Sequence, residues 1–264
     1  MDIRGGGGTI DLDRPHGFTC RRTGPRAGAF EGLLSGCGAL AHGSIGMTRR
    51  IAMRVFVAGA TGRVATELIA NLKAAGHQVV AGARKPENVA DREVQSTALD
   101  LHADAKELKA LIADADAVYF VAGSRGKDLL QTDAFGAVKL MQACEATGVR
   151  RFVMLSSVFA DEPEKWGDPA LAKITDYNIA KFFADQWLMN NTHLVYTIVQ
   201  PGSLVEGSGS GRVNLHVTER SSPNSIANVA AVLAGVLEAK NSYGRIIKMS
   251  DGDTEVSEAI AQYR

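Results

Sequence analysis

One stretch decides the fold of this chain: Arg54-Val55-Phe56-Val57-Ala58-Gly59-Ala60-Thr61-Gly62-Arg63-Val64-Ala65. Its first five residues form an apolar, β-branched run of the kind that makes a buried parallel strand. A glycine turn follows, and the next apolar residues recur at helical spacing until Gly76, where we expect a helix C-cap. Such a turn points backbone N–H groups and the positive end of a helix dipole at one spot, which predicts a pyrophosphate-binding turn. In it, Gly59 permits the tight bend, Gly62 lets a phosphate approach the backbone, and Ala65 permits close helix–sheet packing.

The same alternation of strand and helix continues toward the C-terminus. Buried strands are predicted over residues 78–83, 94–99, 117–122, 152–156, 194–199 and 245–249. Helices are predicted over residues 62–75, 104–112, 132–147, 174–190 and 225–239, with a short one at the end. Strands separated by helices of this length indicate βαβ units with right-handed crossovers. We therefore expect an α/β fold, a Rossmann-type doubly wound parallel sheet with a small C-terminal substrate-binding portion.

Residues 1–52 differ in composition from the rest of the chain. They hold 12 of the 28 glycines and seven arginines, but no lysine, tyrosine or tryptophan. Their glycine runs have neither helical nor strand periodicity, and their acidic residues argue against an organelle transit peptide. We predict a disordered leader, or upstream sequence translated from a mis-set start, before a single domain at residues 53–264.

The bulk composition limits the classes of function. The chain carries 29 basic and 29 acidic residues, so no global field attracts nucleic acid or an anionic membrane surface. No apolar run approaches the roughly 20 residues that a membrane-spanning helix requires. Three scattered cysteines indicate a reducing, cytoplasmic setting without a disulfide framework. The histidines and cysteines lack metal-ligand spacing, so no protein-built metal site is expected.

A basic pair follows the strand predicted over residues 78–83. In dinucleotide-binding folds this position meets the adenosine ribose, where an acid holds the 2′-hydroxyl and an arginine accommodates a 2′-phosphate. This chain has Arg84 and Lys85 there and no acid. Arg63 adds a third positive group just after the glycine turn, and a guanidinium suits phosphate through its bidentate fork. The pattern favours NADP(H) over NAD(H), the alternative being that these cations are solvated surface groups.

Residues capable of acid–base chemistry follow the strand predicted over residues 152–156. Ser156 and Ser157 stand at its carboxyl end, where open α/β sheets bind ligands. The next predicted helix carries Tyr177 and Lys181, and a spacing of four residues puts both on one helix face. An ammonium group beside a phenol favours its ionised form, so the tyrosine could exchange a proton with a carbonyl or alcohol oxygen during hydride transfer with a nicotinamide. A serine hydroxyl would hold that oxygen; the alternative is a tyrosine packed on the sheet beside a surface lysine.

Five segments together resemble the short-chain dehydrogenases/reductases: GATGRVA at residues 59–65, VAGS at 121–124, SSV at 156–158, YNIAK at 177–181 and QPG at 200–202. The resemblance covers nearly all of residues 53–264 and is closest to the atypical subgroup with NmrA-like and flavin/biliverdin-reductase-like NAD(P)H-binding proteins. It implies phosphate contacts from Gly59, Thr61, Gly62 and Arg63, adenine contacts from Asp100 and Leu101, and ribose contacts from Ala122 and Gly123. It also implies that Pro201, Gly202 and Ser203 border the nicotinamide carboxamide. The implied catalytic set is Ser156 or Ser157, Tyr177 and Lys181, with Lys181 also bonding the nicotinamide ribose.

The chain departs from these relatives at two positions and has its own expected substrate wall. Thr132-Asp133 stand where many relatives place an asparagine, and Gln200 replaces the arginine usual in sugar-nucleotide epimerases. The wall is expected from residues 159–171, with Phe159 and Trp166, and from residues 204–218, where a glycine- and serine-rich run indicates a mobile flap. The two aromatic residues either stack on a planar substrate or plug the domain edge.

The sequence therefore predicts an NAD(P)H-dependent oxidoreductase of the short-chain dehydrogenase/reductase type. Its substrate would be a small carbonyl, quinone or flavin-like molecule, with Tyr177 as proton donor and Lys181 as its activator. Two alternatives stay open: a non-catalytic, NmrA-like redox sensor that binds NADP(H), and an NAD-dependent sugar-nucleotide epimerase or dehydratase. The expected partner is a small-molecule substrate, with no nucleic acid and no membrane, and the expected state is a monomer or small homo-oligomer.

Overall fold

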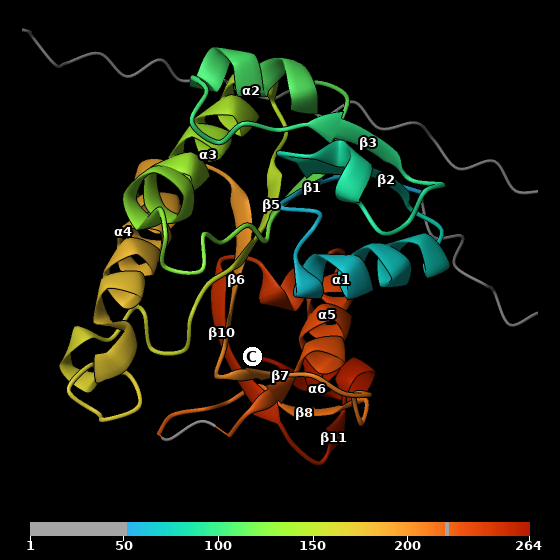
Figure 1. Cartoon of the computed structure of the whole chain (residues 1–264). Helices are drawn as coiled ribbons and strands as arrows, with labels where there is room; N and C mark the ends of the chain where they lie inside the picture. The colour runs from blue at the N-terminus through green and yellow to red at the C-terminus, as the bar shows by residue number, and fades with distance from the viewer. Residues whose placement is uncertain (1–51, 220–221) are drawn as a thin grey trace, which may run out of the picture. The chain divides into compact units, whose positions relative to one another are not determined.

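The computed structural model describes residues 52–219 and 222–264, so the predicted leader lies outside the described residues except for Ala52. A nine-stranded sheet crosses this part of the chain with helices on both faces (Figure 1). Seven strands run parallel in the order β3-β2-β1-β4-β5-β6-β10. Their bounds are β1 (Arg54–Ala58), β2 (Gln78–Ala83), β3 (Gln95–Ala98), β4 (Ala117–Phe120), β5 (Arg151–Leu155), β6 (Val195–Pro201) and β10 (Arg245–Asp251).

The strand order reverses between β1 and β4. The chain moves outward from β1 to β3 and then returns to the other side of β1 at β4. In open α/β sheets, ligands bind at such a switch point, outside the carboxyl ends of the strands. Because Ala58 pairs with both Gly82 and Phe120, the glycine turn after β1 begins where β2 and β4 also end.

Three α-helices of the described residues cover each face of the sheet (Figure 1). One layer holds α1 (Arg63–Ala74), α5 (Ile226–Gly235) and α6 (Val256–Gln262), and the other holds α2 (Ala105–Ile112), α3 (Gly136–Thr147) and α4 (Thr175–Asn191). Alternate residues of β1 pack into opposite layers, Val55 and Val57 with Leu68 of α1, and Phe56 with Leu140 of α3. Burying one such apolar side chain contributes about 1.5 to 3 kcal/mol, which explains why residues 55–58 of β1 are apolar.

Two predicted helices differ from the structure at one end. The helix predicted over residues 132–147 begins as a π-helical segment, η2 (Leu129–Phe135), before α3. The helix predicted over residues 225–239 ends at Gly235. The buried Arg151 side chain explains that end, because it donates to the Val236 and Leu237 carbonyls at 2.7 and 2.9 Å. Arg151, on a distant strand, thus donates hydrogen bonds to carbonyls that would otherwise accept from N–H groups of a further helical turn.

The C-terminal portion contains short strands that the sequence pattern did not predict. Strands β8 (Arg212–Asn214) and β11 (Thr254–Glu255) extend the sheet beyond β10 in antiparallel fashion. Strands β7 (Leu204–Val205) and β9 (Asn224–Ser225) form a separate parallel pair. Runs of two or three residues are too short to show a period of two, so only tertiary pairing reveals them.

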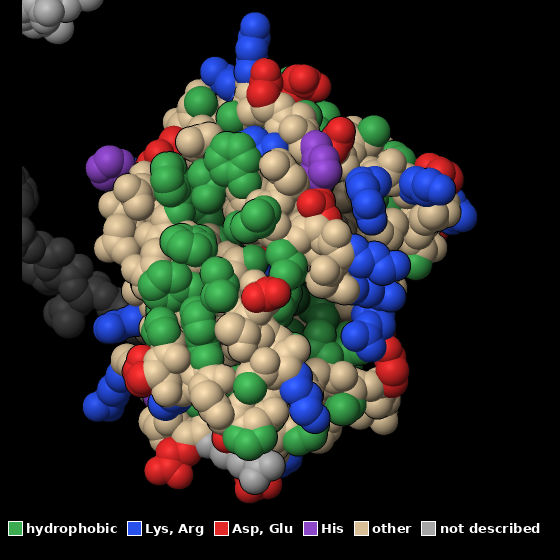
Figure 2. Space-filling view, turned by 60° about the vertical axis from the view of Figure 1, so that its left-hand side comes forward, with side chains coloured by type: hydrophobic (Ala, Val, Ile, Leu, Met, Phe, Trp, Pro, Cys, Tyr) green, Lys and Arg blue, Asp and Glu red, His purple; other side chains and the backbone are tan. Residues whose placement is uncertain are grey.

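Apolar side chains gather on the side of the molecule where η2 and α4 lie (Figure 2). The exposed large apolar residues of these two helices are Leu130, Phe135, Phe183 and Trp187. No helix among the described residues is long and apolar enough to span a membrane.

Candidate active site

The glycine turn after β1 has a backbone that only glycine can adopt at its first position. Gly59 has a φ of +92°, and a Cβ there would lie 2.5 Å from the Cα of Ala122. The N–H groups of Gly59 and Ala60 both donate to the Gly82 carbonyl, at 2.9 and 3.0 Å. These contacts hold the turn against the ends of β2 and β4 and confirm the tight bend predicted at Gly59.

The first turn of α1 lacks the side-chain cap that α2 and α5 have. At its N-cap, Gly62, no side chain accepts a hydrogen bond, and the first turn has no acidic residue. By contrast, the Asp104 carboxylate caps α2 and the Ser225 hydroxyl caps α5. N–H groups at a helix start, together with the positive end of the helix dipole, bind anions. The start of α1 therefore suits a phosphate group.

A cleft of about 530 Å³ opens over this turn. It is lined by ten of the residues predicted to bind a dinucleotide: Gly59, Thr61, Gly62, Arg63, Arg84, Asp100, Leu101, Ala122, Gly123 and Lys181. Arg84 is exposed at the cleft, whereas Lys85 is exposed and is not among the lining residues. A contact of Lys85 with a 2′-phosphate stays a prediction.

Three basic side chains that line the cleft were missed by the sequence reasoning: His102, Arg125 and Lys127. Arg125 and Lys127 lie in the loop after β4, where Arg125 and Gly126 have φ values of +56° and +80°. The Nε2 atom of His102 lies 2.6 Å from an oxygen of Asp128 in the same loop. The basic residues of the segment VAGSRGK, residues 121–127, were the sequence signal that could have predicted Arg125 and Lys127 at the cleft. With the arginines named above, they make the cleft suitable for a ligand with several phosphates.

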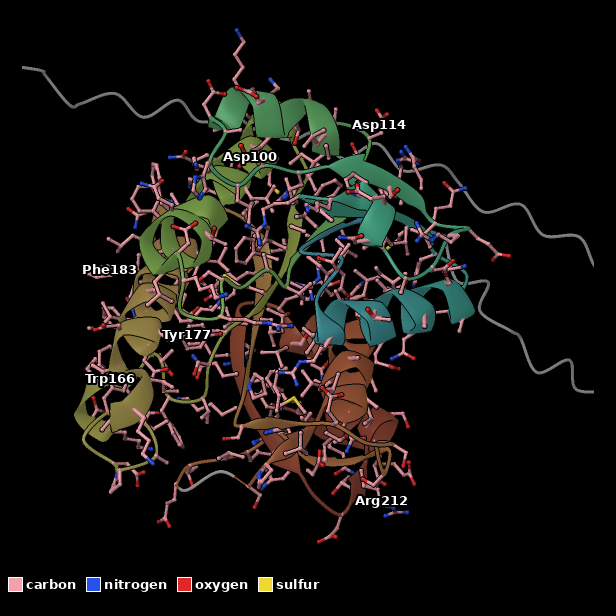
Figure 3. The ribbon with its side chains drawn as sticks, viewed as in Figure 1. Asp100, Asp114, Trp166, Tyr177, Phe183 and Arg212 are labelled. Carbon is pink, nitrogen blue, oxygen red and sulfur yellow. The ribbon has the colours of Figure 1, made fainter. Side chains whose placement is uncertain are left out.

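A second cavity of about 1110 Å³ lies at the carboxyl ends of β5 and β6. It is lined by five further predicted site residues: Ser156, Ser157, Pro201, Gly202 and Ser203. The last three therefore line this cavity and are not among the residues that line the cleft. Four residues line both spaces, namely Arg63, Leu155, Tyr177 and Leu204. Tyr177, carried by α4, thus stands where the two spaces meet (Figure 3).

The structure brings Tyr177 and Lys181 together at this junction. The Lys181 Nζ atom lies 5.6 Å from the centre of the Tyr177 ring and donates to the Leu155 carbonyl at 3.3 Å. The lysine side chain is 1% exposed, and the Asp133 Oδ1 atom lies 3.9 Å from its Nζ. Asp133 is fully buried in η2, and its other oxygen accepts from the Ser124 N–H at 3.0 Å. Asp133, identified from the sequence only as a departure from relatives, is thus the counter-ion of the buried lysine.

Both serines are buried and already hold hydrogen-bond partners. The Ser157 hydroxyl donates to Asn178 Oδ1 at 2.8 Å, and the Ser156 hydroxyl donates to Asp185 Oδ2 at 2.8 Å. The Gln200 Nε2 group donates to the same Asp185 oxygen at 3.0 Å. Burial raises the pKa of Asp185 to about 7, although the bonds from the serine and the glutamine act in the opposite direction. The sequence reasoning missed Asn178 and Asp185 as partners of the serines. Both lie on α4, the helix that also carries Tyr177 and Lys181.

The two aromatic residues of the expected substrate wall have different positions. Phe159 lines the second cavity, with a φ of +59° and the Lys165 ammonium 4.1 Å from its ring centre. Trp166 is not among the lining residues. Its ring packs edge-on against Phe182 with centres 6.0 Å apart, and its Nε1 group donates to the Phe159 carbonyl at 2.9 Å. Trp166 therefore plugs the edge of the domain and holds Phe159, and of residues 204–218 only Leu204 lines this cavity.

An ion pair joins the glycine turn to the segment after β7. The Arg63 Nη1 atom lies 2.6 Å from the Glu206 Oε1 atom, and the two side chains are 49% and 72% exposed. The pair therefore places a carboxylate beside a cation that the cleft offers to an anionic ligand.

A dinucleotide fits the cleft on the geometry described above. A side chain at Gly59 would fill the space of the turn, α1 begins without a cap, and Arg63 and Arg84 face the cleft. The family model described as NAD(P)H-binding matches residues 59–240. This range includes the glycine turn, the residues named above for the cleft and the second cavity, and α4. The chain belongs to this NAD(P)H-binding family.

Individual relatives of this family member are similar over most of its length. The Bacillus subtilis protein named as the uncharacterized sugar epimerase YhfK is 30% identical over 79% of this chain and 99% of its own length. The solved structure of the oxidoreductase ylbE from Lactococcus lactis is 39% identical, with a TM-score of 0.75 over 79% of this chain and 95% of that one. A Bacillus halodurans structure, named as a candidate NAD-dependent epimerase/dehydratase, is 32% identical, with a TM-score of 0.72 over 80% of this chain and 100% of that one.

These comparisons confirm the predicted Rossmann-type α/β fold and the resemblance to NAD(P)H-binding proteins. The family binds a nicotinamide dinucleotide, and relatives of this chain carry the names oxidoreductase and sugar epimerase.

Proposed function

We propose that this protein is an NADP(H)-dependent oxidoreductase that reduces a small carbonyl, quinone or flavin-like acceptor. The observation that carries the proposal is the position of Tyr177, which lines both the cleft and the second cavity. A proton-bearing group at this junction can reach an acceptor in the cavity while the dinucleotide occupies the cleft. The buried Lys181 beside it supports acid–base chemistry of the short-chain dehydrogenase/reductase type.

The residues of the cleft would hold the dinucleotide in a definite order. The turn at Gly59 and Gly62 and the start of α1 would bind the pyrophosphate, with Arg63 beside it. Arg84 would bind the 2′-phosphate through its guanidinium fork. Asp100 would lie by the adenine and Lys181 would bond the nicotinamide ribose. When bound, the cofactor would supply the hydride that, together with one proton, reduces the acceptor by two electrons.

The chain's own residues would manage the proton that accompanies this hydride. Tyr177 donates its hydroxyl proton to the acceptor oxygen, so a carbonyl becomes an alcohol and a quinone becomes a hydroquinone. The Lys181 ammonium stabilises the phenolate that remains, and water returns the proton afterwards. Asp133 holds the lysine in place as its counter-ion. Ser156 or Ser157 holds the acceptor oxygen by a hydrogen bond.

A titration of the purified full-length protein with NADPH and NADH, followed by nicotinamide fluorescence, tests the cofactor assignment. We expect tighter binding of NADPH, and Arg84→Ala should weaken NADPH binding by roughly tenfold without changing NADH binding. Lys109→Ala is the control, because Lys109 is exposed on α2 and does not line the cleft. No binding of either dinucleotide would overturn the proposal. Oxidation of NADPH in the presence of menadione, flavin mononucleotide or benzaldehyde then tests turnover.

The names of the relatives favour an epimerase or dehydratase as the second candidate. Glu164 and Asp168 line the second cavity, and carboxylates can accept hydrogen bonds from sugar hydroxyls. An epimerase recycles its cofactor, so the purified protein would retain NAD(H) and consume none during turnover. Equal affinities for NADPH and NADH, together with retained NAD(H), would favour this candidate over the first.

A further inference from the structure

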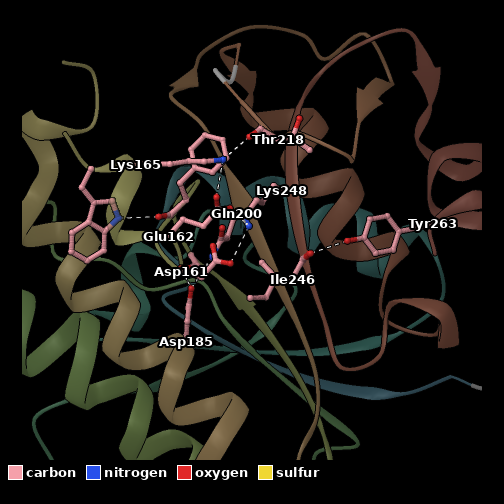
Figure 4. A network of polar contacts seen from close by, with 12 residues as sticks. Asp161, Glu162, Lys165, Asp185, Gln200, Thr218, Ile246, Lys248 and Tyr263 are labelled. Carbon is pink, nitrogen blue, oxygen red and sulfur yellow. Dashed lines mark hydrogen bonds and ion pairs between the residues drawn. The ribbon is translucent and has the colours of Figure 1, made fainter. Parts of the chain in front are cut away.

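A buried polar cluster borders the second cavity, and its two fully buried members have no part in the proton transfer proposed above. Its members are Ser156, Asp185 and Gln200, and Figure 4 labels Asp185 and Gln200. Asp185 and Gln200 are fully buried, whereas Ser156 is also among the residues that line the cavity. The cluster therefore connects a carboxyl group that is out of contact with solvent to a hydroxyl group at the cavity wall.

The two oxygens of Asp185 have different surroundings. Oδ2 accepts hydrogen bonds from Ser156 at 2.8 Å and from Gln200 at 3.0 Å. Oδ1 is buried and has no hydrogen-bond partner among the described residues. A proton on Oδ2 would find the Ser156 oxygen as its acceptor, whereas a proton on Oδ1 would find none. The carboxyl group therefore holds a proton best on Oδ2.

The charges around Asp185 are engaged elsewhere. Lys181, on the same helix, lies 3.9 Å from Asp133 of η2. Asp161, from the segment after β5, forms an ion pair with Lys248 of β10 at 3.0 Å. Lys181 lowers and Asp161 raises the pKa of Asp185, but burial acts most strongly and brings it to about 7. Both the neutral and the ionised carboxyl group are therefore populated near neutral pH.

We infer that Asp185 is a positioning residue whose proton decides whether the Ser156 hydroxyl donates or accepts a hydrogen bond in the second cavity. The ionised carboxylate takes the Ser156 hydrogen, as in the structure, so the Ser156 oxygen can only accept from a ligand. The neutral carboxyl group donates its Oδ2 proton to that oxygen, and the Ser156 hydrogen is then free to bind a ligand. The exchange takes up one proton from solvent and forms one O–H bond, at Asp185 Oδ2, and no other covalent bond changes.

The exchange selects the oxidation state of the bound ligand, and this consequence rests on the proposed function. A carbonyl oxygen has lone pairs but no hydrogen, so it needs a donating Ser156. An alcohol has a hydrogen to give, so it can bind an accepting Ser156. Reduction of a carbonyl or quinone is therefore favoured with Asp185 neutral.

The inference is tested by two measurements on the full-length protein and its Asp185→Asn and Ser156→Ala variants. The first is an NMR titration of protein labelled with ¹³C at the aspartate carboxyl carbons. One signal should titrate near neutral pH, be absent in Asp185→Asn and move to higher pH in Ser156→Ala, which removes a hydrogen bond to the carboxylate. The second is the pH profile of kcat/KM for NADPH-dependent reduction of menadione.

In the wild-type protein kcat/KM should fall about tenfold between roughly pH 6 and pH 8, as Asp185 loses its proton. Asp185→Asn should remain active without this fall, because its amide group donates to Ser156 at every pH. Asp161→Asn is the matched control, since it removes a nearby carboxylate that does not contact Ser156, and it should keep the fall. Asp185→Gln carries the same amide group on a side chain one methylene longer. It should show no fall of kcat/KM with pH and should be less active than wild type.

The inference is overturned if no aspartate signal titrates near neutral pH, or if the fall in kcat/KM persists in Asp185→Asn. A protein that reduces none of menadione, flavin mononucleotide and benzaldehyde contradicts the proposed function alone. In that case the NMR titration decides: a displaced midpoint in Ser156→Ala supports the coupling of Asp185 to Ser156, and an unchanged midpoint refutes it.

Discussion

The cofactor cleft and the second cavity meet at Tyr177 but are built in different ways. The cleft presents backbone groups of a glycine turn, a helix start without a side-chain cap and exposed cations such as Arg84. The second cavity presents Ser156 and Ser157, whose hydroxyls are bound by buried partners on α4. Binding in the cleft therefore depends on backbone groups and exposed cations at the ends of neighbouring strands. The chemistry of the second cavity depends instead on buried side chains of α4 that hold the two serine hydroxyls in place.

Gly59→Ala should disrupt the glycine turn of the cleft and cost more stability and cofactor binding than the substitutions that follow. The new Cβ would lie 2.5 Å from the Ala122 backbone at a φ of +92°. We expect the free energy of unfolding to fall by roughly 3 to 5 kcal/mol and NADPH binding to be lost. Denaturant unfolding and NADPH fluorescence measure the two effects. Gly76→Ala is the control, because it has a φ of +90° with nothing within 4 Å and should cost about 1 kcal/mol without affecting binding.

Tyr177→Phe separates the chemistry of the junction from binding in the cleft. Removal of the hydroxyl proton should lower kcat by roughly 100-fold to 10,000-fold while the Kd for NADPH changes less than about twofold. Tyr196→Phe on β6 removes a hydroxyl from a residue that lines neither space and should change neither value. Steady-state kinetics with menadione and fluorescence titration measure them. A non-catalytic sensor would show unchanged binding and no acceptor-dependent oxidation of NADPH in either protein.

Asp185→Asn tests the buried support of the second cavity through stability. The carboxyl group has a pKa of about 7 in the folded protein, raised by burial from the ordinary aspartate value of 3.8. Between these values the folded state holds a proton that the unfolded state has lost, so the wild-type free energy of unfolding falls as pH rises. The asparagine variant escapes this loss and should gain roughly 2 to 4 kcal/mol relative to wild type between about pH 4 and pH 8. Urea unfolding at the two pH values decides, and a pH-independent difference would refute the shifted pKa.

Glu206→Gln should change NADPH binding in the cleft less than the preceding substitutions change binding, activity or stability. It removes the carboxylate that lies 2.6 Å from Arg63, and this carboxylate competes with a phosphate for the guanidinium. The affinity for NADPH should rise about twofold to fivefold, and the stability should change by less than about 0.5 kcal/mol because the pair is exposed. Glu255→Gln is the matched control, since it breaks the similarly exposed pair with Arg212 at 2.9 Å. An equal rise in affinity in both variants would point to a general charge effect.

Much of the fold was predictable because its signals are local. The apolar run of β1 and the helical spacing of α1 gave the strand-turn-helix unit, and Ser156 and Tyr177 follow from their places after a strand and on the next helix. Short elements such as β8 and the early end of α5 were not predictable. The first exists only through its antiparallel pairing with β10 and β11, and the second depends on Arg151 from a distant strand.

The sequence by itself determined the α/β order of elements, the glycine turn at Gly59 and the tyrosine–lysine pair on one helix face. Each of these depends on residues within a few positions of one another, where backbone geometry and helical spacing act directly. Only the tertiary structure decided that Asp133 pairs with Lys181 and that Asp185 holds Ser156. These contacts join segments 29 to 48 residues apart, and a buried carboxylate acquires its role from whichever group the packed sheet and helices place beside it.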